Sequence, residues 1–183
     1  VHNSYPRAGA DRSSASMVNY YDRRHAIKAF ASVAVQSDGS TVIGGEGTPN
    51  RVPIAFVSPE FFATLGVPLA LGHMFGEAEM LYGPDQVAVL TDRFWRAHFN
   101  SDPNIVGRKL FNDGLPVTII GVLPRDFHFL SSRAEFFRPA AHGPDDLKPD
   151  KRHNNSYQMI ARLAPGATLA DAQAQIDAFN QQQ

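Results

Sequence analysis

Residues 109–123 predict a β-hairpin, and this hairpin limits the possible folds more than any other feature of the sequence. Two extended runs, 109–111 and 115–123, flank the turn Asn112-Asp113-Gly114, and the second run is rich in β-branched residues. Aspartate and glycine supply the positive φ angles that a tight hairpin turn needs. The sequence therefore predicts an antiparallel pair of strands at this point.

Other extended runs predict further strands. Residues 30–35 have a two-residue period, and the turn-forming sequence Ser37-Asp38-Gly39-Ser40 separates them from the run 41–43. This arrangement predicts a second hairpin. Strands are also expected at residues 51–57, 86–90 and 157–163, and shorter extended pieces at 1–5, 126–129 and 135–139.

Four segments carry the signals of a helix start, because serine and threonine side chains cap the free amides of a first turn. Ser58 is followed by Pro59, which suits the first helical position, and Gly66 can end the helix in a left-handed conformation. The other predicted caps are Ser16 before residues 17–27, Thr91 before 92–99, and Thr168, which forms a capping box with Asp171.

Helical spacing predicts which helix faces are buried. In the first helix the predicted buried face is Met17, Tyr20, Tyr21, Arg24 and Ile27, and the predicted solvated face carries Asn19, Asp22, Arg23 and Lys28. In the last helix the predicted buried face is Leu169, Ala172, Ile176 and Phe179. Strands, hairpins and capped helices together indicate an α+β fold.

Length and composition exclude several classes of protein. A chain of 183 residues is long enough for one or two domains with a substantial core. Its 17 basic residues balance 18 acidic ones, and the net charge of −1 argues against a dedicated nucleic-acid binder. Because the chain has no cysteine, disulfides, thiolate metal sites and cysteine nucleophiles are excluded. No apolar run approaches the roughly 18 residues of a membrane span, and both chain ends suggest a soluble piece of a longer protein.

We predict no catalytic residue, no cofactor-binding residue and no metal ligand. The cluster Gly44-Gly45-Glu46-Gly47 lacks the lysine and the following helix that phosphate binding needs. His73, Glu77 and Glu79 have the residue types of a metal site, but two neighbouring glycines argue against the helix that would align them. These three residues are therefore interpreted as part of a solvated loop.

Other candidate residues have a structural explanation. Ser58 lies between a strand and a helix, as some nucleophilic serines do, but no partner histidine or acid is indicated. Asp150 and His153 lie in a polar loop and are interpreted as surface residues. Trp95 and its aromatic neighbours are more typical of a core than of a ligand-stacking site. A hydrolase that used the histidine-containing loops would show turnover that His153→Ala abolishes.

An ordered series of motifs resembles one protein family. Residues 57–68 read Val-Ser-Pro-Glu-Phe-Phe-Ala-Thr-Leu-Gly-Val-Pro, and residues 71–75 read Leu-Gly-His-Met-Phe. This pair resembles the signature of the MacB-like periplasmic core domain of ABC transporter permeases of the MacB/FtsX family. Further similar blocks are 87–90, 94–99, 102–110, 113–114, 118–124 with Phe127 and Phe129, and 161–169 with Ala172. Two positions depart from the family pattern: His73, where arginine is common, and the segment 136–139.

The resemblance implies a fold with two subdomains. A porter-like subdomain with βαβ units is expected at residues 1–67 and 140–183, with its sheet left incomplete by truncation at the C-terminus. A second, mostly β subdomain is expected to be inserted at 68–139. In the family, this domain lies between the first and second transmembrane helices, on the periplasmic side of the bacterial inner (cytoplasmic) membrane.

The function that the resemblance implies is not catalytic. The domain would couple ATP-driven movement of the membrane helices to a periplasmic substrate or partner protein, through rigid-body rotation of its subdomains. The implied partners are the permease's own transmembrane helices, a separate ATPase domain or subunit, a periplasmic adaptor or substrate, and a second copy of the permease; no cofactor and no nucleic acid are expected. Contacts with partners are expected on the loops 72–84 and 142–155. The alternative is a periplasmic ligand- or lipoprotein-binding module with a groove between the two subdomains.

Overall fold

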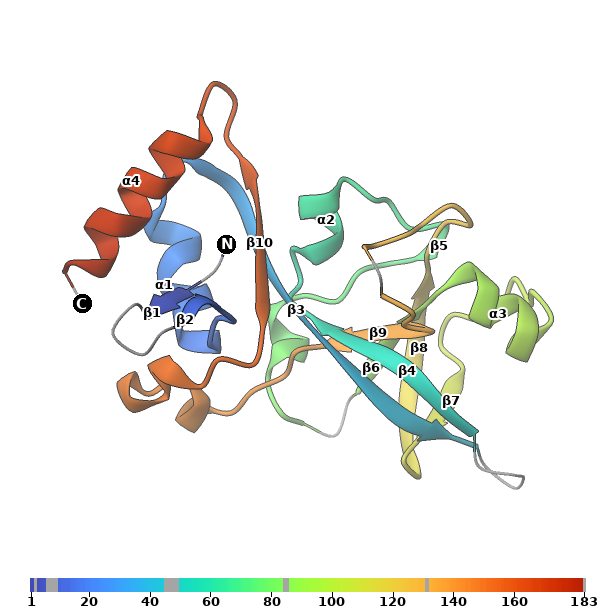
Figure 1. Ribbon diagram of the computed structural model, residues 1–183. Coiled ribbons are helices and arrows are strands. Elements are labelled where there is room, and N and C mark those ends of the chain that lie inside the picture. The colour runs from blue at the N-terminus through green and yellow to red at the C-terminus, as the bar shows by residue number, and fades with distance from the viewer. Residues whose placement is uncertain (2, 6–9, 45–49, 84–85, 131, 183) are drawn as a thin grey trace. The chain divides into compact units, whose positions relative to one another are not determined.

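The computed structural model describes residues 1, 3–5, 10–44, 50–83, 86–130 and 132–182 (Figure 1). These residues form a mixed arrangement of helices and strands, which confirms the predicted α+β class. They divide into two compact units. Unit 1 comprises Val1–Gln36, Glu60–Gly66 and Gly143–Gln183, and unit 2 comprises Ser37–Pro59 and Val67–His142.

The sequence-based subdomain ranges, 1–67 with 140–183 and 68–139, stay a prediction. The compact units differ from those ranges chiefly at residues 37–59, which belong to unit 2. Pairing explains this grouping, because strand β4 (Asn50–Val57) lies parallel to β9 (Phe136–Pro139) and is hydrogen-bonded to it.

Unit 1 combines helices with short antiparallel pairs of strands. Strand β1 (Asn3–Tyr5) pairs with β2 (Ala10–Ser13), and β10 (Gln158–Leu163) pairs with the first part of β3 (Phe30–Ile43). The helices are α1 (Met17–Ala26), α2 (Phe61–Leu65) and α4 (Leu169–Asn180), with the short 3-10 helices η3 (Pro144–Leu147) and η4 (Pro149–His153). One core cluster consists of Ile27, Ala29, Ala172 and Ile176, with Phe30, Leu163 and Phe179 packed against it.

Two of the predicted helix caps in unit 1 are confirmed. The Ser16 hydroxyl accepts a hydrogen bond from the Asn19 amide at 3.1 Å, at the start of α1. The Thr168 hydroxyl accepts from the Asp171 amide at 3.1 Å, and the Asp171 carboxylate accepts from the Thr168 amide at 2.8 Å. This reciprocal pair is the capping box that the sequence predicts for α4.

The predicted faces of α1 and α4 are wrong at three residues. Arg23 was expected in solvent but is only 4% exposed, and its Nη2 donates to Asn180 Oδ1 at 3.2 Å. Asn19 is also buried, because its side chain accepts from the Ser16 amide in the capping geometry. Leu169 was expected in the core but is 78% exposed, since it lies in the first turn of α4. Spacing along one helix does not reveal which distant element covers it.

Helix α2 begins later than predicted, so the predicted cap at Ser58 is wrong. The N-cap residue is Glu60, and its side chain makes no capping hydrogen bond. Its carboxylate instead accepts from the hydroxyl of the buried Tyr20 at 2.5 Å and lies 3.5 Å from Arg24. The predicted left-handed stop at Gly66 is confirmed, with φ of 73°.

Unit 2 is built on the larger part of the sheet. Within unit 2 the strand order is β3-β4-β9-β6-β8-β5, with β6 at Val87–Leu90, β8 at Leu115–Val122 and β5 at Leu71–Gly72. Strand β7 (Lys109–Asn112) pairs with both β3 and β8. Strands β6 and β8 are parallel, and helix α3 (Asp92–Phe99) lies between them in the chain, as parallel pairing requires a crossover. The core cluster of this unit is Ile43, Val52, Ile54, Ala88, Leu90, Phe94, Ile105, Leu110, Val117, Ile119, Val122 and Phe136.

One predicted hairpin is confirmed and the other is wrong. Strands β7 and β8 are antiparallel, and their turn has Asp113 at φ 49° and Gly114 at φ 78°. By contrast, β3 runs without a turn from residue 30 to residue 43. A Cβ at Gly39 would lie 3.0 Å from the Phe56 ring, so this glycine makes room for a side chain of β4. The local sequence does not distinguish a glycine that makes room for a side chain of a neighbouring strand from a glycine that forms a turn.

The carboxylate of Asp113 connects the hairpin turn to β3. It accepts hydrogen bonds from the Val42 amide at 3.0 Å and from the Thr41 hydroxyl at 2.7 Å. These two bonds, the first above all, hold the pKa of Asp113 below its usual value of 3.8. A carboxylate whose pKa is lower in the folded state stabilises the fold above the unfolded-state pKa, and this contribution is lost as the pH falls through the folded-state pKa.

We therefore expect Asp113→Asn to lower the free energy of unfolding at about pH 7, and to matter progressively less as the pH falls below 3.8. Urea denaturation of both proteins across this pH range measures the difference. Glu77→Gln, in the exposed part of η2 (Glu77–Met80), serves as a charge-matched control. A loss of stability that is equally large at every pH would contradict the role of the ionised carboxylate.

Candidate functional site

The residues with metal-ligand chemistry do not form a site. His73 is exposed, and its Nδ1 lies 3.0 Å from the Met74 carbonyl oxygen. Glu79 accepts from the Gly76 amide at 2.8 Å and so caps the short helix η2. Among the residues that the structure describes, no three histidine, aspartate or glutamate side chains are grouped so that they could hold a metal ion.

The other candidates from the sequence occupy structural positions. Ser58 is fully buried, and Trp95 donates from Nε1 to the Asp102 carbonyl oxygen at 3.0 Å while packing against the core of unit 2. Asp150 lies 3.6 Å from Lys151 on η4, and both side chains are exposed. The glycine cluster lies outside the described residues except for Gly44.

The two loops expected to contact partners have different structures. In the first, Met80 is fully buried, while Leu81 and Tyr82 are 58% and 70% exposed. The second contains η3 and η4, and η4 is joined to α1 by an ion pair between Arg152 and Asp22. The first loop therefore presents two large apolar side chains to solvent, whereas part of the second is folded against a helix.

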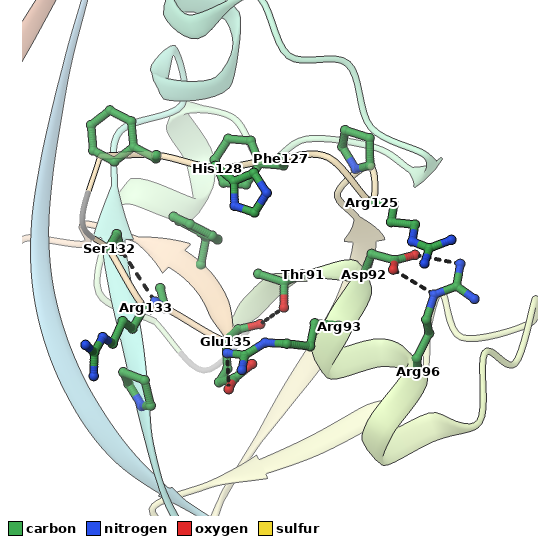
Figure 2. A pocket seen from close by; sticks show the side chains of 15 residues that line it. Thr91, Asp92, Arg93, Arg96, Arg125, Phe127, His128, Ser132, Arg133 and Glu135 are labelled. Carbon is green, nitrogen blue, oxygen red and sulfur yellow. Dashed lines mark hydrogen bonds and ion pairs between the residues drawn. The ribbon is translucent and has the colours of Figure 1, made fainter.

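Unit 2 contains a groove that the sequence did not predict (Figure 2). Its volume is about 860 Å³, and it lies between the beginning of α3 and residues 124–129 and 132–135. Its aromatic lining residues are Phe127, which is half-buried, and the buried Phe129 and Phe137. The rings of Phe127 and Phe137 meet edge to face at 5.7 Å between centroids. Polar and charged side chains complete the lining: Thr91, Asp92, Arg93, Arg96, Arg125, His128, Ser132, Arg133 and Glu135.

Thr91 holds the two sides of this groove together. Its hydroxyl accepts from the Phe94 amide at 3.2 Å, which confirms it as the cap of α3. The same hydroxyl donates to the Glu135 carbonyl oxygen at 2.9 Å, and the Thr91 amide donates to that oxygen at 3.0 Å. The first turn of α3 is thereby fixed beside the residue that precedes β9.

Positive charge exceeds negative charge in the groove. Two arginines are paired: Arg93 lies 2.6 Å from the Glu135 carboxylate, and Arg96 donates to both oxygens of Asp92 at 2.7 and 3.0 Å. Arg125 and Arg133 are exposed, and neither makes an ion pair or hydrogen bond within the described part of the chain. Four guanidinium groups thus face two carboxylates, and both carboxylates are already engaged.

Leu130, which follows the groove residue Phe129 in the sequence, has an unusual backbone conformation. Leu130 has φ of 48° and is 81% exposed. A non-glycine residue in this left-handed region costs roughly 1–2 kcal/mol, and such strain is concentrated at functional sites. A large apolar side chain, next in the sequence to the groove residue Phe129, is therefore exposed to solvent in an unfavourable backbone conformation.

Sequence reasoning missed the groove because its arginines come from separate stretches of the chain. Arg93 and Arg96 lie on a helix that was read for its aromatic residues, and Arg125 and Arg133 flank a segment that was expected to be extended. The structure shows no strand at residues 126–129, so that expectation is wrong. The feature that could have indicated the groove is the pair of arginines, Arg125 and Arg133, on either side of Phe127 and Phe129. No local sequence pattern connects these arginines to α3.

The fold is similar to those of three solved domains. The periplasmic region of MacB from Actinobacillus actinomycetemcomitans is 14% identical, with a TM-score of 0.67 over 99% of this chain and 80% of that one. A domain of a putative permease from Porphyromonas gingivalis is 16% identical, with a TM-score of 0.70 over 94% and 72% of the two chains. The extracellular domain of the noncanonic ABC-type transporter YknZ from Gram-positive bacteria is 12% identical, with a TM-score of 0.63 over 95% and 85%.

The sequence matches the MacB-like periplasmic core domain over residues 2–179. The chain therefore belongs to this family, and it is a periplasmic domain of a MacB-like ABC transporter permease, as its motifs predicted. No curated protein matches it. Across the described residues, no helix is both long enough and apolar enough to cross a membrane.

Proposed function

We propose that this domain is non-catalytic and couples ATP-driven movement of its permease's membrane helices to a periplasmic substrate or partner protein. Membership of the MacB-like periplasmic core domain family is the observation that carries the proposal. On this proposal the domain transmits mechanical movement and serves efflux. The energy comes from a separate ATPase domain or subunit, and a second copy of the permease would complete the assembly.

The way in which the chain connects its two units supports transmission of movement. Strand β1 and helix α4 both belong to unit 1, so membrane helices that flank the domain would act on unit 1 first. The chain then passes between the units at residues 36–37, 59–60, 66–67 and 142–143. The first passage lies inside β3, a continuous strand, and a hydrogen-bonded strand opens at a higher free-energy cost than a loop does.

The experiment that tests this proposal is hydrogen exchange on the full-length permease in membranes, with and without ATP and its ATPase. We expect the protection of amides in residues 72–83 and 142–155 to change during the nucleotide cycle. Those segments carry exposed side chains and short helices. The free energy of local unfolding is low in such segments. A permease whose ATPase cannot hydrolyse ATP is the control.

If these amides are unchanged with ATP and change only when a periplasmic ligand is added, the domain is a static receptor. The alternative proposal, a ligand- or lipoprotein-binding module, would then replace coupling. The groove of unit 2 favours this second candidate, because it combines aromatic surface with a few convergent polar groups. Saturable binding by the 183-residue chain alone is what this alternative requires.

A further inference from the structure

We propose that the groove of unit 2 binds an acidic, extended peptide segment of an extracytoplasmic partner protein. The inference deepens the proposed function, on which it rests for the presence of such a partner. Three features of the groove carry it: two arginines that make no ion pair among the described residues, their separation, and the half-buried ring of Phe127 in the lining.

The charge of the groove is opposite in sign to that of the whole chain. The protein has a net charge of −1, yet the groove has two more arginines than carboxylates. Arg93 and Arg96 are neutralised by Glu135 and Asp92. The excess is therefore located on Arg125 and Arg133, whose planar guanidinium groups are suited to carboxylate recognition.

The positions of these two arginines favour an extended ligand. Arg125 and Arg133 lie at opposite ends of the groove in Figure 2, with the side chains of Arg93 and Glu135 between them. One small anion would reach only one of the two guanidinium groups. A peptide with carboxylates spaced along its length would reach both, because extended residues advance about 3.3 Å each.

An aromatic residue supplies the second half of the recognition. Side chains of an extended peptide alternate between opposite sides, so one set of side chains can meet the arginines while the other packs on the half-buried ring of Phe127.

The test uses the 183-residue chain and a fluorescein-labelled octapeptide of alternating glutamate and leucine. Fluorescence anisotropy should show saturable binding that weakens with added salt. Arg125→Gln and Arg133→Gln should each weaken binding about three- to fivefold, and the double variant about tenfold or more. Lys28→Gln is the matched control, because it removes an exposed positive charge from unit 1 and should leave binding unchanged.

The variants should fold normally, since both arginines are exposed and make no ion pair in the described structure; circular dichroism checks this. Equal affinity for a glutamine–leucine octapeptide would overturn the proposal, as would unchanged affinity in the double variant. Arginine-dependent binding of phosphatidylglycerol vesicles, without peptide binding, would assign the groove to lipid headgroups and overturn it. The same pattern with inorganic phosphate would assign it to a small anion and also overturn it.

This titration is independent of the hydrogen-exchange experiment. If the peptide fails to bind while ATP still changes protection in residues 72–83 and 142–155, coupling stands and the acidic-peptide site is wrong. If the peptide binds in the expected way but ATP changes nothing, the site stands and the domain is a receptor.

Discussion

Gly72→Ala is expected to lower the free energy of unfolding by roughly 3 kcal/mol or more, which is among the largest effects of a single methyl group. Gly72 has φ of 78°, a region that costs an L-residue roughly 1–2 kcal/mol by itself. An added Cβ would also lie 2.0 Å from the Ile120 carbonyl oxygen and 2.8 Å from Gly121 Cα. Both atoms belong to the backbone of β8, so no side-chain rotation relieves the collision.

The close approach arises from the pairing of β5 with β8. Gly72 is directly opposite Gly121, and a Cβ at Gly121 would in turn lie 2.6 Å from the Leu69 side chain. The two glycines therefore let the short strand β5 lie against β8. The Leu-Gly motif at residues 71–72, which contributed to the family resemblance, has its physical explanation in this contact.

Gly107→Ala is the matched control for Gly72→Ala. Gly107 also has a positive φ, of 90°, but a Cβ there would meet no atom within 4 Å. Gly107→Ala should therefore lower the free energy of unfolding only by the roughly 1–2 kcal/mol that the backbone conformation costs. Urea denaturation followed by fluorescence of Trp95, the one tryptophan in the chain, reports on unit 2. Equal losses in the two variants would contradict the steric explanation.

Phe94→Ala is expected to destabilise unit 2 by about 3–5 kcal/mol, the usual range for a fully buried phenylalanine. Phe94 is 1% exposed and belongs to the core cluster of unit 2. Its ring centroid lies 5.6 Å from that of Phe136 and 6.2 Å from that of Phe99. Removing the ring leaves a cavity beneath α3, which carries two of the groove arginines.

Phe111→Ala makes the same chemical change in unit 2 at a residue that is 46% exposed. It should cost about 1 kcal/mol or less, because much of that side chain is already in water. Thermal and urea denaturation of both variants measure the difference. If Phe111→Ala were as destabilising as Phe94→Ala, the core would not be centred where the structure places it.

Features that depend on neighbouring residues were predictable from the sequence. The caps at Ser16, Thr91 and Thr168 each need only the residues that follow within one turn. The hairpin turn at Asp113 and Gly114 needs only two residues that accept positive φ. In each case the interacting groups are close in the sequence, so the pattern contains the whole interaction.

Features that depend on distant residues were not predictable. The local sequence at Gly39 predicts a turn, because the contact that explains this glycine, with the Phe56 ring, comes from a separate strand. Helical spacing predicts a solvated Arg23, because Asn180, which accepts its hydrogen bond, lies at the other end of the chain. The groove was not predicted for the same reason, since packing brings α3 beside residues 124–129 and 132–135.

The sequence by itself determined the family of this protein, its α+β class, and the positions of most helices and strands. These follow from local hydrogen bonding, backbone preferences and an ordered set of motifs. Tertiary structure alone decided that β3 continues without a turn, that Arg23 is buried, and that four arginines share one groove. Such features are set by which surfaces pack together, and packing joins residues that no sequence period relates.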